Sequence, residues 1–236
     1  IIGESSSSRT RKQDLLLLRL DFDLQFDPGF AQLGAFHYNG PANECEKGFA
    51  VVVQPDGKLV AGGAAVNSNS KEDMLVIRVN QNGTLDSSFG TNGSFHWSSA
   101  GDYADYANNL ALQPDGRIVV TGAAGTATGF QIATLRLLSS GQLDSGFGLN
   151  GMVTYAGLTG VDAYPYGLLV QLDGKIAVAG SSMNSAGNKD AVVLRYTADG
   201  QLDPLFGVGG LLVFDAPGGG TDVANGLALQ PDQGVL

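Results

Sequence analysis

The sequence predicts an all-β fold built from four copies of one unit, and three observations lead to this prediction. The phrase QPDGKLVAGG at Gln54 returns as QPDGRIVVTG at Gln113 and QLDGKIAVAG at Gln171, and begins again as QPDQGVL at Gln230. The 35 glycines among 236 residues are about twice the usual share of ~7%, which favours many tight turns. No segment shows the sustained period of about 3.6 residues that is typical of amphipathic helices.

A second phrase recurs in step with the first, as LDSSFG, LDSGFG, LDPLFG and, in altered form, FDPGFA. An arginine in an apolar run precedes the aspartate of this phrase, and a phenylalanine follows it, at constant spacing. The four sets are Arg19, Asp27 and Phe30; Arg78, Asp86 and Phe89; Arg136, Asp144 and Phe147; and Arg195, Asp203 and Phe206. The chain is therefore four copies of a unit of about 59 residues, a period typical of solenoids, propellers or arrays. We expect one domain over residues 1–236.

The secondary structure of one copy follows from its apolar runs and turn residues. NNLALQ (108–113) is a short apolar strand, and PDG supplies a tight turn that leads to a second strand, RIVVTG (117–122). FQIATLRLL (130–138) is the third strand, and GMVTY (151–155), after the LDSGFG loop, is the fourth. Four antiparallel strands with short connections are the size of a propeller blade. A β-solenoid would need shorter rungs and a sandwich would not need identical units, so the sequence predicts a β-propeller.

The hairpin register makes a specific prediction about backbone angles. The glycines that end the PDG turns and the turns before the LDxxFG phrase should have positive φ, where glycine is the residue without steric cost. These are Gly57, Gly83, Gly116, Gly174 and Gly200.

The pairing of QPDGK(I/L)xVxG with RxxxxGxLDxxFGxxG resembles the delta-60 repeat, a β-propeller repeat found in tandem in bacterial, often secreted or surface, proteins. The resemblance covers all four copies. It implies a propeller fold and a secreted or cell-surface location, and no general activity, because the function of the family is unknown. The first copy departs from the pattern because DFDLQFDPGF lacks the turn glycine, and the last because Gln233 replaces the glycine of PDG.

The two ends of the sequence fall within the same strand of the repeat. Residues 1–3 correspond to the end of the KLVAGG strand, and residues 235–236 to its beginning. This phase favours a closed ring of four blades in which the split strand joins the ends. An arc of a larger propeller, closed by more blades or by a second chain, is the alternative.

Composition excludes several classes of partner and cofactor. A net charge of −10 repels phosphate backbones, so we expect no nucleic-acid partner. The single cysteine, Cys45, allows neither an internal disulfide nor a cysteine-based metal cluster. No apolar run approaches the ~18 residues of a membrane span, so we expect no membrane insertion.

The repeated Arg/Asp pairs are candidates for a structural role. An arginine in an otherwise buried strand needs a partner, because an unpaired buried charge is very costly. The aspartate eight residues later can accept a bidentate bond and fix its turn against the strand. A ring of ligand-binding arginines is the alternative, but the use of the same pair in every copy favours structural pairs.

Acidic residues suggest two further kinds of cation site, and the repeat pattern favours neither. Glu46, Asp105, Asp162 and Asp222 precede the repeated glutamine by eight or nine residues. In a ring they would share one level and form a cation site or a polar channel lining, although solvated loop charges are the simpler account. The segments NQNGTLD and TADGQLD resemble calcium loops, but LSSGQLD in the sister copy lacks most of the oxygen ligands. A turn is therefore favoured, and we predict no metal site.

Histidines and aromatic residues distinguish the first two copies from the others. His37 and Tyr38 in AFHYNG occupy the same place as His96 and Trp97 in SFHWSS. The other copies have threonine and phenylalanine where these histidines stand, so a ring of metal-binding histidines is incomplete. Exposed aromatic rings here can stack on sugars or on another protein, or they can pack between blades. These four residues are the candidate ligand-binding residues.

The sequence contains no nucleophile with a supporting base, no GxSxG, no phosphate loop and no dinucleotide fingerprint. We expect a non-catalytic secreted or cell-surface bacterial module, a scaffold or adhesive binding platform without a cofactor. A propeller-type glycan lyase or hydrolase and a structural subunit of an extracellular fibre or array are the alternatives. Four near-equal blades argue against an enzyme, because catalysis needs unlike residues at one place. The expected partners are a polysaccharide, a surface protein or a second copy of the chain.

Overall fold

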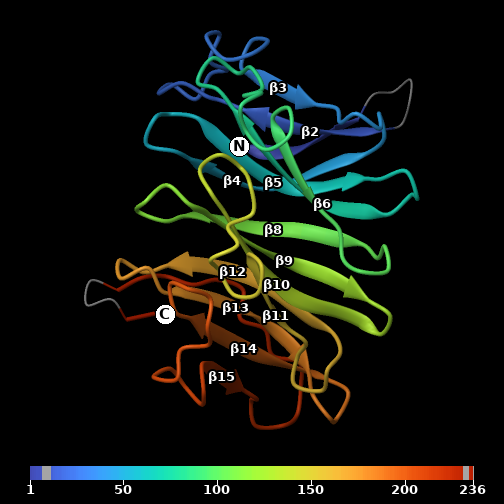
Figure 1. Ribbon diagram of the computed structural model, residues 1–236, viewed down its shortest axis with the longest axis vertical. Helices are drawn as coiled ribbons and strands as arrows, with labels where there is room; N and C mark the ends of the chain where they lie inside the picture. Colours follow the sequence, from blue (N-terminus) through green and yellow to red (C-terminus); the bar gives the residue numbers. More distant parts are fainter. Residues whose placement is uncertain (7–11, 231–233, 236) are drawn as a thin grey trace. The chain divides into compact units, whose positions relative to one another are not determined.

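The computed structural model describes residues 1–6, 12–230 and 234–235, and the secondary structure in these residues is β-strand and turn (Figure 1). Gln233, which replaces the glycine of the PDG turn in the last copy, lies outside the described residues. The first sheet has the order β1-β2-β3. Its strands are β1 (Ile2–Ser6), β2 (Gln13–Leu18) and β3 (Ala35–Tyr38).

The other three sheets described have four strands each, as the repeat predicts. The second consists of β4 (Glu46–Val53), β5 (Leu59–Val66), β6 (Glu72–Val79) and β7 (Ser94–Trp97). The third consists of β8 (Asp105–Leu112), β9 (Ile118–Thr126), β10 (Gly129–Leu137) and β11 (Met152–Tyr155). The fourth consists of β12 (Ala163–Val170), β13 (Ile176–Met183), β14 (Lys189–Tyr196) and β15 (Leu211–Phe214). In each, the strands follow one another in sequence order across the sheet.

These sheets are the four copies of the repeat, folded as propeller-type blades. The first differs from the prediction, because the described residues give it three strands instead of four, and no sheet closes on itself. The chain divides into two compact units, which we call the N-terminal unit (1–110 and 140–142) and the C-terminal unit (111–139 and 143–236). A single domain over residues 1–236 stays a prediction. None of the described residues form a helix that is long and apolar enough to span a membrane.

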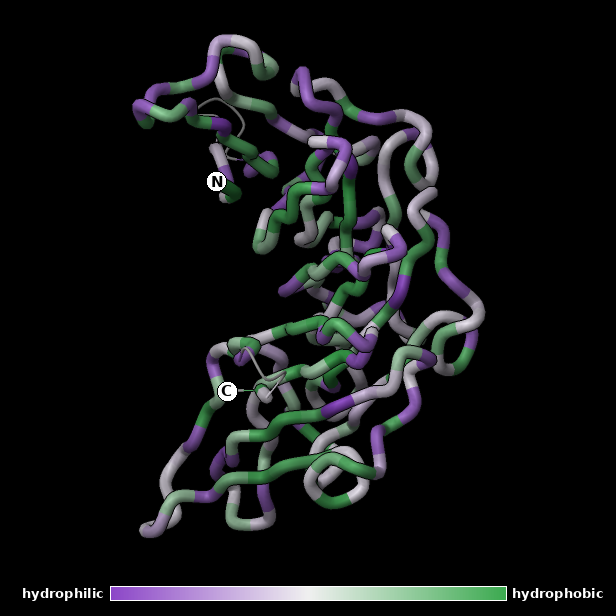
Figure 2. Tube along the Cα trace, turned by 90° about the vertical axis from the view of Figure 1, so that its left-hand side faces the viewer, coloured by the Kyte–Doolittle hydropathy of each residue, from purple (hydrophilic) through white to green (hydrophobic). Residues whose placement is uncertain are grey.

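The second strand of each four-stranded blade is almost entirely buried and rich in alanine and glycine, as in LVAGGAAV of β5 and IAVAGSSM of β13. Small side chains on both faces let neighbouring sheets approach. Along the chain, hydrophobic stretches alternate with hydrophilic ones (Figure 2). In the N-terminal unit, Leu15 and Leu17 of the first blade pack with Leu75 and Ile77 of the second. A corresponding cluster in the C-terminal unit joins the third and fourth blades.

The turn glycines have the positive φ angles that the hairpin register predicts. The angles are 77° at Gly57, 81° at Gly83, 85° at Gly116, 83° at Gly174 and 83° at Gly200. The backbone N–H of Gly57 donates to the carbonyl of Gln54 at 2.8 Å, which closes the PDG turn. The predicted register is therefore confirmed at these turns.

Replacing Gly174 with alanine should lower the free energy of unfolding by about 1–2 kcal/mol, because a φ of 83° is strained for a residue with a Cβ atom. Gly3→Ala is the matched control, since Gly3 lacks a positive φ and has open space where a Cβ would lie. Urea unfolding of both variants checks this. Equal stability of the two variants would contradict the assigned turn geometry.

Candidate functional site

The repeated arginine and aspartate form an ion pair in every copy. The distance between the arginine Nε and the aspartate Oδ2 varies little along the chain. It is 2.7 Å for Arg19–Asp27, 2.7 Å for Arg78–Asp86, 2.8 Å for Arg136–Asp144 and 2.9 Å for Arg195–Asp203. The pairs of the second, third and fourth copies are largely buried, whereas about a third of the Arg19 side chain is exposed.

The prediction that the repeated arginine binds both oxygens of its aspartate is wrong, because the two oxygens of each aspartate have different partners. In the second copy, Oδ2 of Asp86 accepts the hydrogen bond from Arg78. Its Oδ1 accepts from the backbone N–H of Ser88 at 3.1 Å and from the Ser88 hydroxyl at 2.6 Å. The aspartate thus fixes the strand with one oxygen and caps its own turn with the other, a local bond that short acidic side chains favour.

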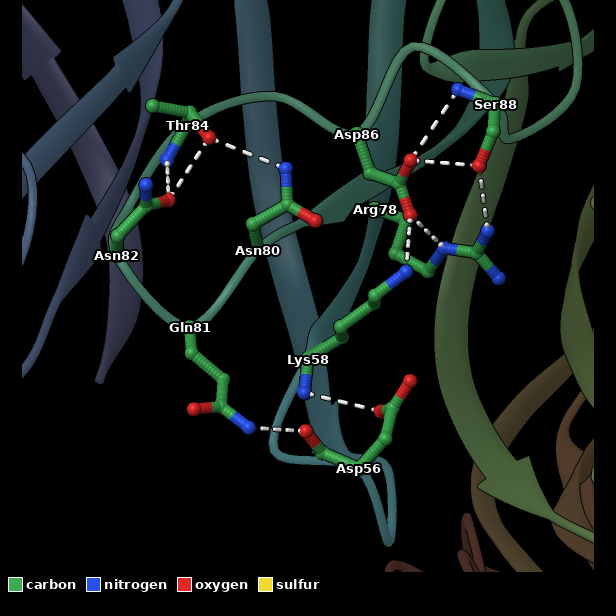
Figure 3. A network of polar contacts seen from close by, with 9 residues as sticks. All are labelled: Asp56, Lys58, Arg78, Asn80, Gln81, Asn82, Thr84, Asp86 and Ser88. Atoms are coloured by element: carbon green, nitrogen blue, oxygen red, sulfur yellow. Dashed lines mark hydrogen bonds and ion pairs between the residues drawn. The ribbon is translucent and has the colours of Figure 1, made fainter.

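A second basic side chain lies beside the same aspartate, and the sequence pattern had not predicted this contact. The ammonium of Lys58 lies 2.8 Å from Oδ2 of Asp86 (Figure 3). The corresponding distances are 3.0 Å for Arg117–Asp144 and 3.6 Å for Lys175–Asp203. Burial opposes ionisation of Asp86, but the hydrogen bonds from Lys58, Ser88 and Arg78 outweigh it and lower the pKa of this carboxyl. In the sequence, the basic residue that follows each PDG turn was the signal for this second contact.

The repeated arginine also joins one copy to the next. The guanidinium of each lies over the phenylalanine of its own set, with 4.8 Å from Arg136 to the ring centre of Phe147. Arg136 donates through Nη1 to the carbonyl of Ala198 in the following copy, and Arg19 donates in the same way to Gln81. The charged groups of these pairs are therefore engaged within the fold, which favours the structural role over a ring of ligand-binding arginines.

The four candidate ligand residues have different surroundings. Tyr38 is buried in the cluster between the first and second blades, so its ring packs between blades. His37 is exposed, and its Nδ1 lies 2.8 Å from the Ser5 hydroxyl. His96 is exposed in β7, the last strand of the second blade, and Trp97 beside it is half-buried. Within the described part of the chain, neither histidine belongs to a group of three close metal-ligating side chains.

The acidic residues before the first strands are not uniformly the solvated loop charges that the simpler account expects. Glu46 and Asp105 are the first residues of β4 and β8 and are buried. Asp105 accepts the backbone N–H of Ser99 at 2.6 Å, and Asp162 that of Phe130 at 3.2 Å. Asp222 has its ligating oxygen within 4.8 Å of those of Asp190 and Asp215.

Glu46 differs from the other acidic residues because neither of its carboxylate oxygens makes a hydrogen bond with a described residue. Its side chain lines a pocket of about 190 Å³ in the N-terminal unit. The β-sheet register aligns Glu46 with Ala65, and Ala65 with Asp73. Asp73 and His96 line the same pocket.

Burial raises the pKa of Glu46 to about 7. The backbone N–H of Gly40 and the positive charge of Lys12 oppose this rise, and the negative charges of Asp14 and Glu44 add to it. Although the His96 side chain is exposed at the surface, the protein atoms around its ring remove part of its solvation and lower its pKa, and the negative charge of Asp73 opposes this. The pocket therefore holds a carboxyl group that changes its charge near neutral pH.

An exposed apolar loop in the first copy was also missed. It replaces the glycine turn of the other copies with the sequence DFDLQ. Phe22 is fully exposed, Leu24 is 75% exposed, and Asp21 and Asp23 flank them. The signal was the apolar residues at a position where the sister copies have QNG, SSG or ADG.

Comparison with known families agrees with this geometry. The family model described as "Domain of unknown function (DUF5122) beta-propeller" matches the chain at residues 54–89, 113–147 and 171–206. No curated protein matches the chain. The first copy lies outside these matches, yet Arg19, Asp27 and Phe30 repeat the contacts of the matched copies. The chain therefore carries three repeats that match this β-propeller family of unknown function.

Proposed function

We propose that the protein is a non-catalytic binding module, a β-propeller that serves as a scaffold or adhesive platform at the bacterial cell surface or after secretion. The exposed loop of the first copy is the observation that carries this proposal. Phe22 and Leu24 expose large apolar side chains at its tip, and Phe26 and Leu33, also exposed, lie close by in the same blade. Apolar patches with a polar rim are typical of sites that bind a partner.

The repeated polar residues support the same proposal. Each arginine and aspartate of the repeat has its charged atoms bound within the fold, so the surface features that differ between copies are the ones left for recognition. The partner we propose is a surface protein or a polysaccharide, since exposed aromatic rings can pack on either. Closure of the four blades into one ring belongs to this proposal, because a closed ring gives a rigid platform.

The double variant Phe22→Ser, Leu24→Ser should lose at least tenfold in binding to the partner, because it removes the apolar tip of the loop. The assay measures retention of the purified protein on intact bacterial cells, peptidoglycan sacculi, cellulose and chitin. Leu205→Ser is the matched control, as Leu205 is equally exposed in the LDPLFG loop of the fourth copy. Both variants should keep their free energy of unfolding within about 0.5 kcal/mol, since these side chains are exposed.

The same assay separates the alternatives. Binding that survives in the double variant would contradict the assignment of the loop. Release of soluble sugar from any of these polysaccharides, abolished by one carboxylate substitution, would support the glycan lyase or hydrolase alternative. Filaments of the pure protein in electron micrographs would support the fibre or array alternative.

A further inference from the structure

We propose that the pocket around Glu46 binds a protonated primary amine carried on a short alkyl chain. The pocket lies within the N-terminal unit, and its occupant is a small cationic group, so this inference goes beyond the proposed function and does not depend on the exposed loop. The amine belongs either to a free alkylamine or to a lysine side chain, and the experiment below distinguishes these sources.

The buried carboxylate of Glu46 in the pocket requires a group that donates hydrogen bonds. Glu46 is 1% exposed, and neither of its carboxylate oxygens has a hydrogen-bond partner among the described residues. A buried acceptor without a partner is costly, and a carboxylate more so than a neutral group. An ammonium group brings three N–H donors and one positive charge. Asp73 lines the same pocket and adds a second acceptor.

The corresponding positions of other copies show that Glu46 is an exception. Asp105 accepts the backbone N–H of Ser99 at 2.6 Å, and Asp222 accepts that of Ala216 at 2.9 Å. In these two copies, a backbone N–H six residues before the acid supplies its partner. In the second blade, the corresponding donor is the backbone N–H of Gly40, which lowers the pKa of Glu46 but does not complete a hydrogen bond with either carboxylate oxygen. A Cβ at Gly40 would be 2.7 Å from Oε1 of Glu46. The longer acid and the glycine together leave an unpartnered carboxyl group beside a cavity.

The walls of the pocket select an organic cation over a metal ion. Pro41, Ala42, Ala65 and Val66 supply an apolar lining that would contact an alkyl chain. The volume of 190 Å³ corresponds to about six water molecules, which is room for a chain of a few carbon atoms. Among the described residues, Glu46, Asp73 and His96 do not form a close metal-ligating group. A divalent cation would therefore lack the clustered oxygen ligands that it needs.

Titration of the protein with n-butylammonium, followed by isothermal calorimetry at pH 8, tests this inference. We expect saturable binding at one site in the millimolar range. Glu46→Gln should weaken it at least tenfold, because the amide carries no charge, whereas Asp199→Asn, which changes an exposed carboxylate of the C-terminal unit, should leave it unchanged. Ala42→Leu is a second variant that narrows the pocket from an exposed position and should also weaken binding.

Three further ligands give the outcomes that support or overturn the proposal. Equal binding of n-butanol would overturn it, because the pocket would then select for the alkyl chain alone. Calcium chloride that displaces n-butylammonium would overturn it in favour of a metal site. Binding of N-acetyl-lysine methylamide with equal or greater affinity would assign the amine to a protein side chain, and its exclusion would assign it to a free alkylamine. Loss of partner binding in the Phe22 and Leu24 variant has no bearing on these results, so the two proposals fail separately.

Discussion

The Asp144→Ala variant is expected to lose about 3–5 kcal/mol of unfolding free energy, because it leaves a buried arginine without its carboxylate. The side chain of Arg136 is 6% exposed, and its Nε lies 2.8 Å from Asp144. The same substitution also removes the partner of Arg117 and the cap on the backbone N–H of Gly146. Urea unfolding, monitored by circular dichroism, measures the change.

Two controls test the cause of this loss. Asp199→Asn should change the free energy of unfolding by less than about 0.5 kcal/mol, since that side chain is exposed. Arg136→Ala should cost less than Asp144→Ala, because Arg117 still pairs with the aspartate when Arg136 is removed. A loss below about 1 kcal/mol for Asp144→Ala would show that the buried pairs do not hold the blades.

Glu46→Gln is expected to remove a fall in stability that the parent protein shows between about pH 4.5 and pH 7. Burial raises the pKa of Glu46 from 4.5 to about 7 in the folded protein. Between these values the unfolded chain loses this proton while the folded protein keeps it, so the free energy of unfolding falls as the pH rises. The fall amounts to about 3 kcal/mol. Urea unfolding from pH 4 to pH 8 measures it.

Above pH 7 the full cost of the buried charge applies, so Glu46→Gln should be more stable than the parent at pH 8 and nearly equal to it at pH 4. The charged and titratable groups around Glu46 are Lys12, Asp14, Tyr38, Glu44, Asp73 and His96. Asp199→Asn should keep the parent's pH profile. Parallel profiles for the parent and Glu46→Gln would contradict the raised pKa.

The repeat pattern predicted the blade well because its signals are local. The PDG phrase specifies a tight turn through the properties of proline and glycine, and Gly57, Gly116 and Gly174 adopt the expected angles. The constant spacing of arginine and aspartate predicted a contact, since the two residues flank one turn. The division of the two aspartate oxygens could not be predicted, because it depends on where the backbone N–H of Ser88 points after the turn.

The candidate site was harder to predict because it depends on departures from the repeat. Glu46 has counterparts that suggested a common role, but its missing partner depends on the loop that places Gly40 beside it. Tyr38 and Trp97 occupy equivalent positions in sequence, yet one is buried between blades and the other is half-buried. Whether an aromatic ring packs or remains exposed is decided by the neighbouring blade, which a single copy of the repeat does not reveal.

The central claim is that the repeated polar residues hold each blade together, whereas recognition belongs to the residues that differ between copies. A double-mutant cycle on Arg78 and Asp86, with Arg78→Ala, Asp86→Ala and the double variant compared by urea unfolding, tests it most directly. The buried contact at 2.7 Å predicts a coupling energy of about 1–3 kcal/mol. It also predicts unchanged retention on cells and polysaccharides wherever the variants remain folded. A coupling energy near zero, together with lost retention by folded single variants, would contradict the claim.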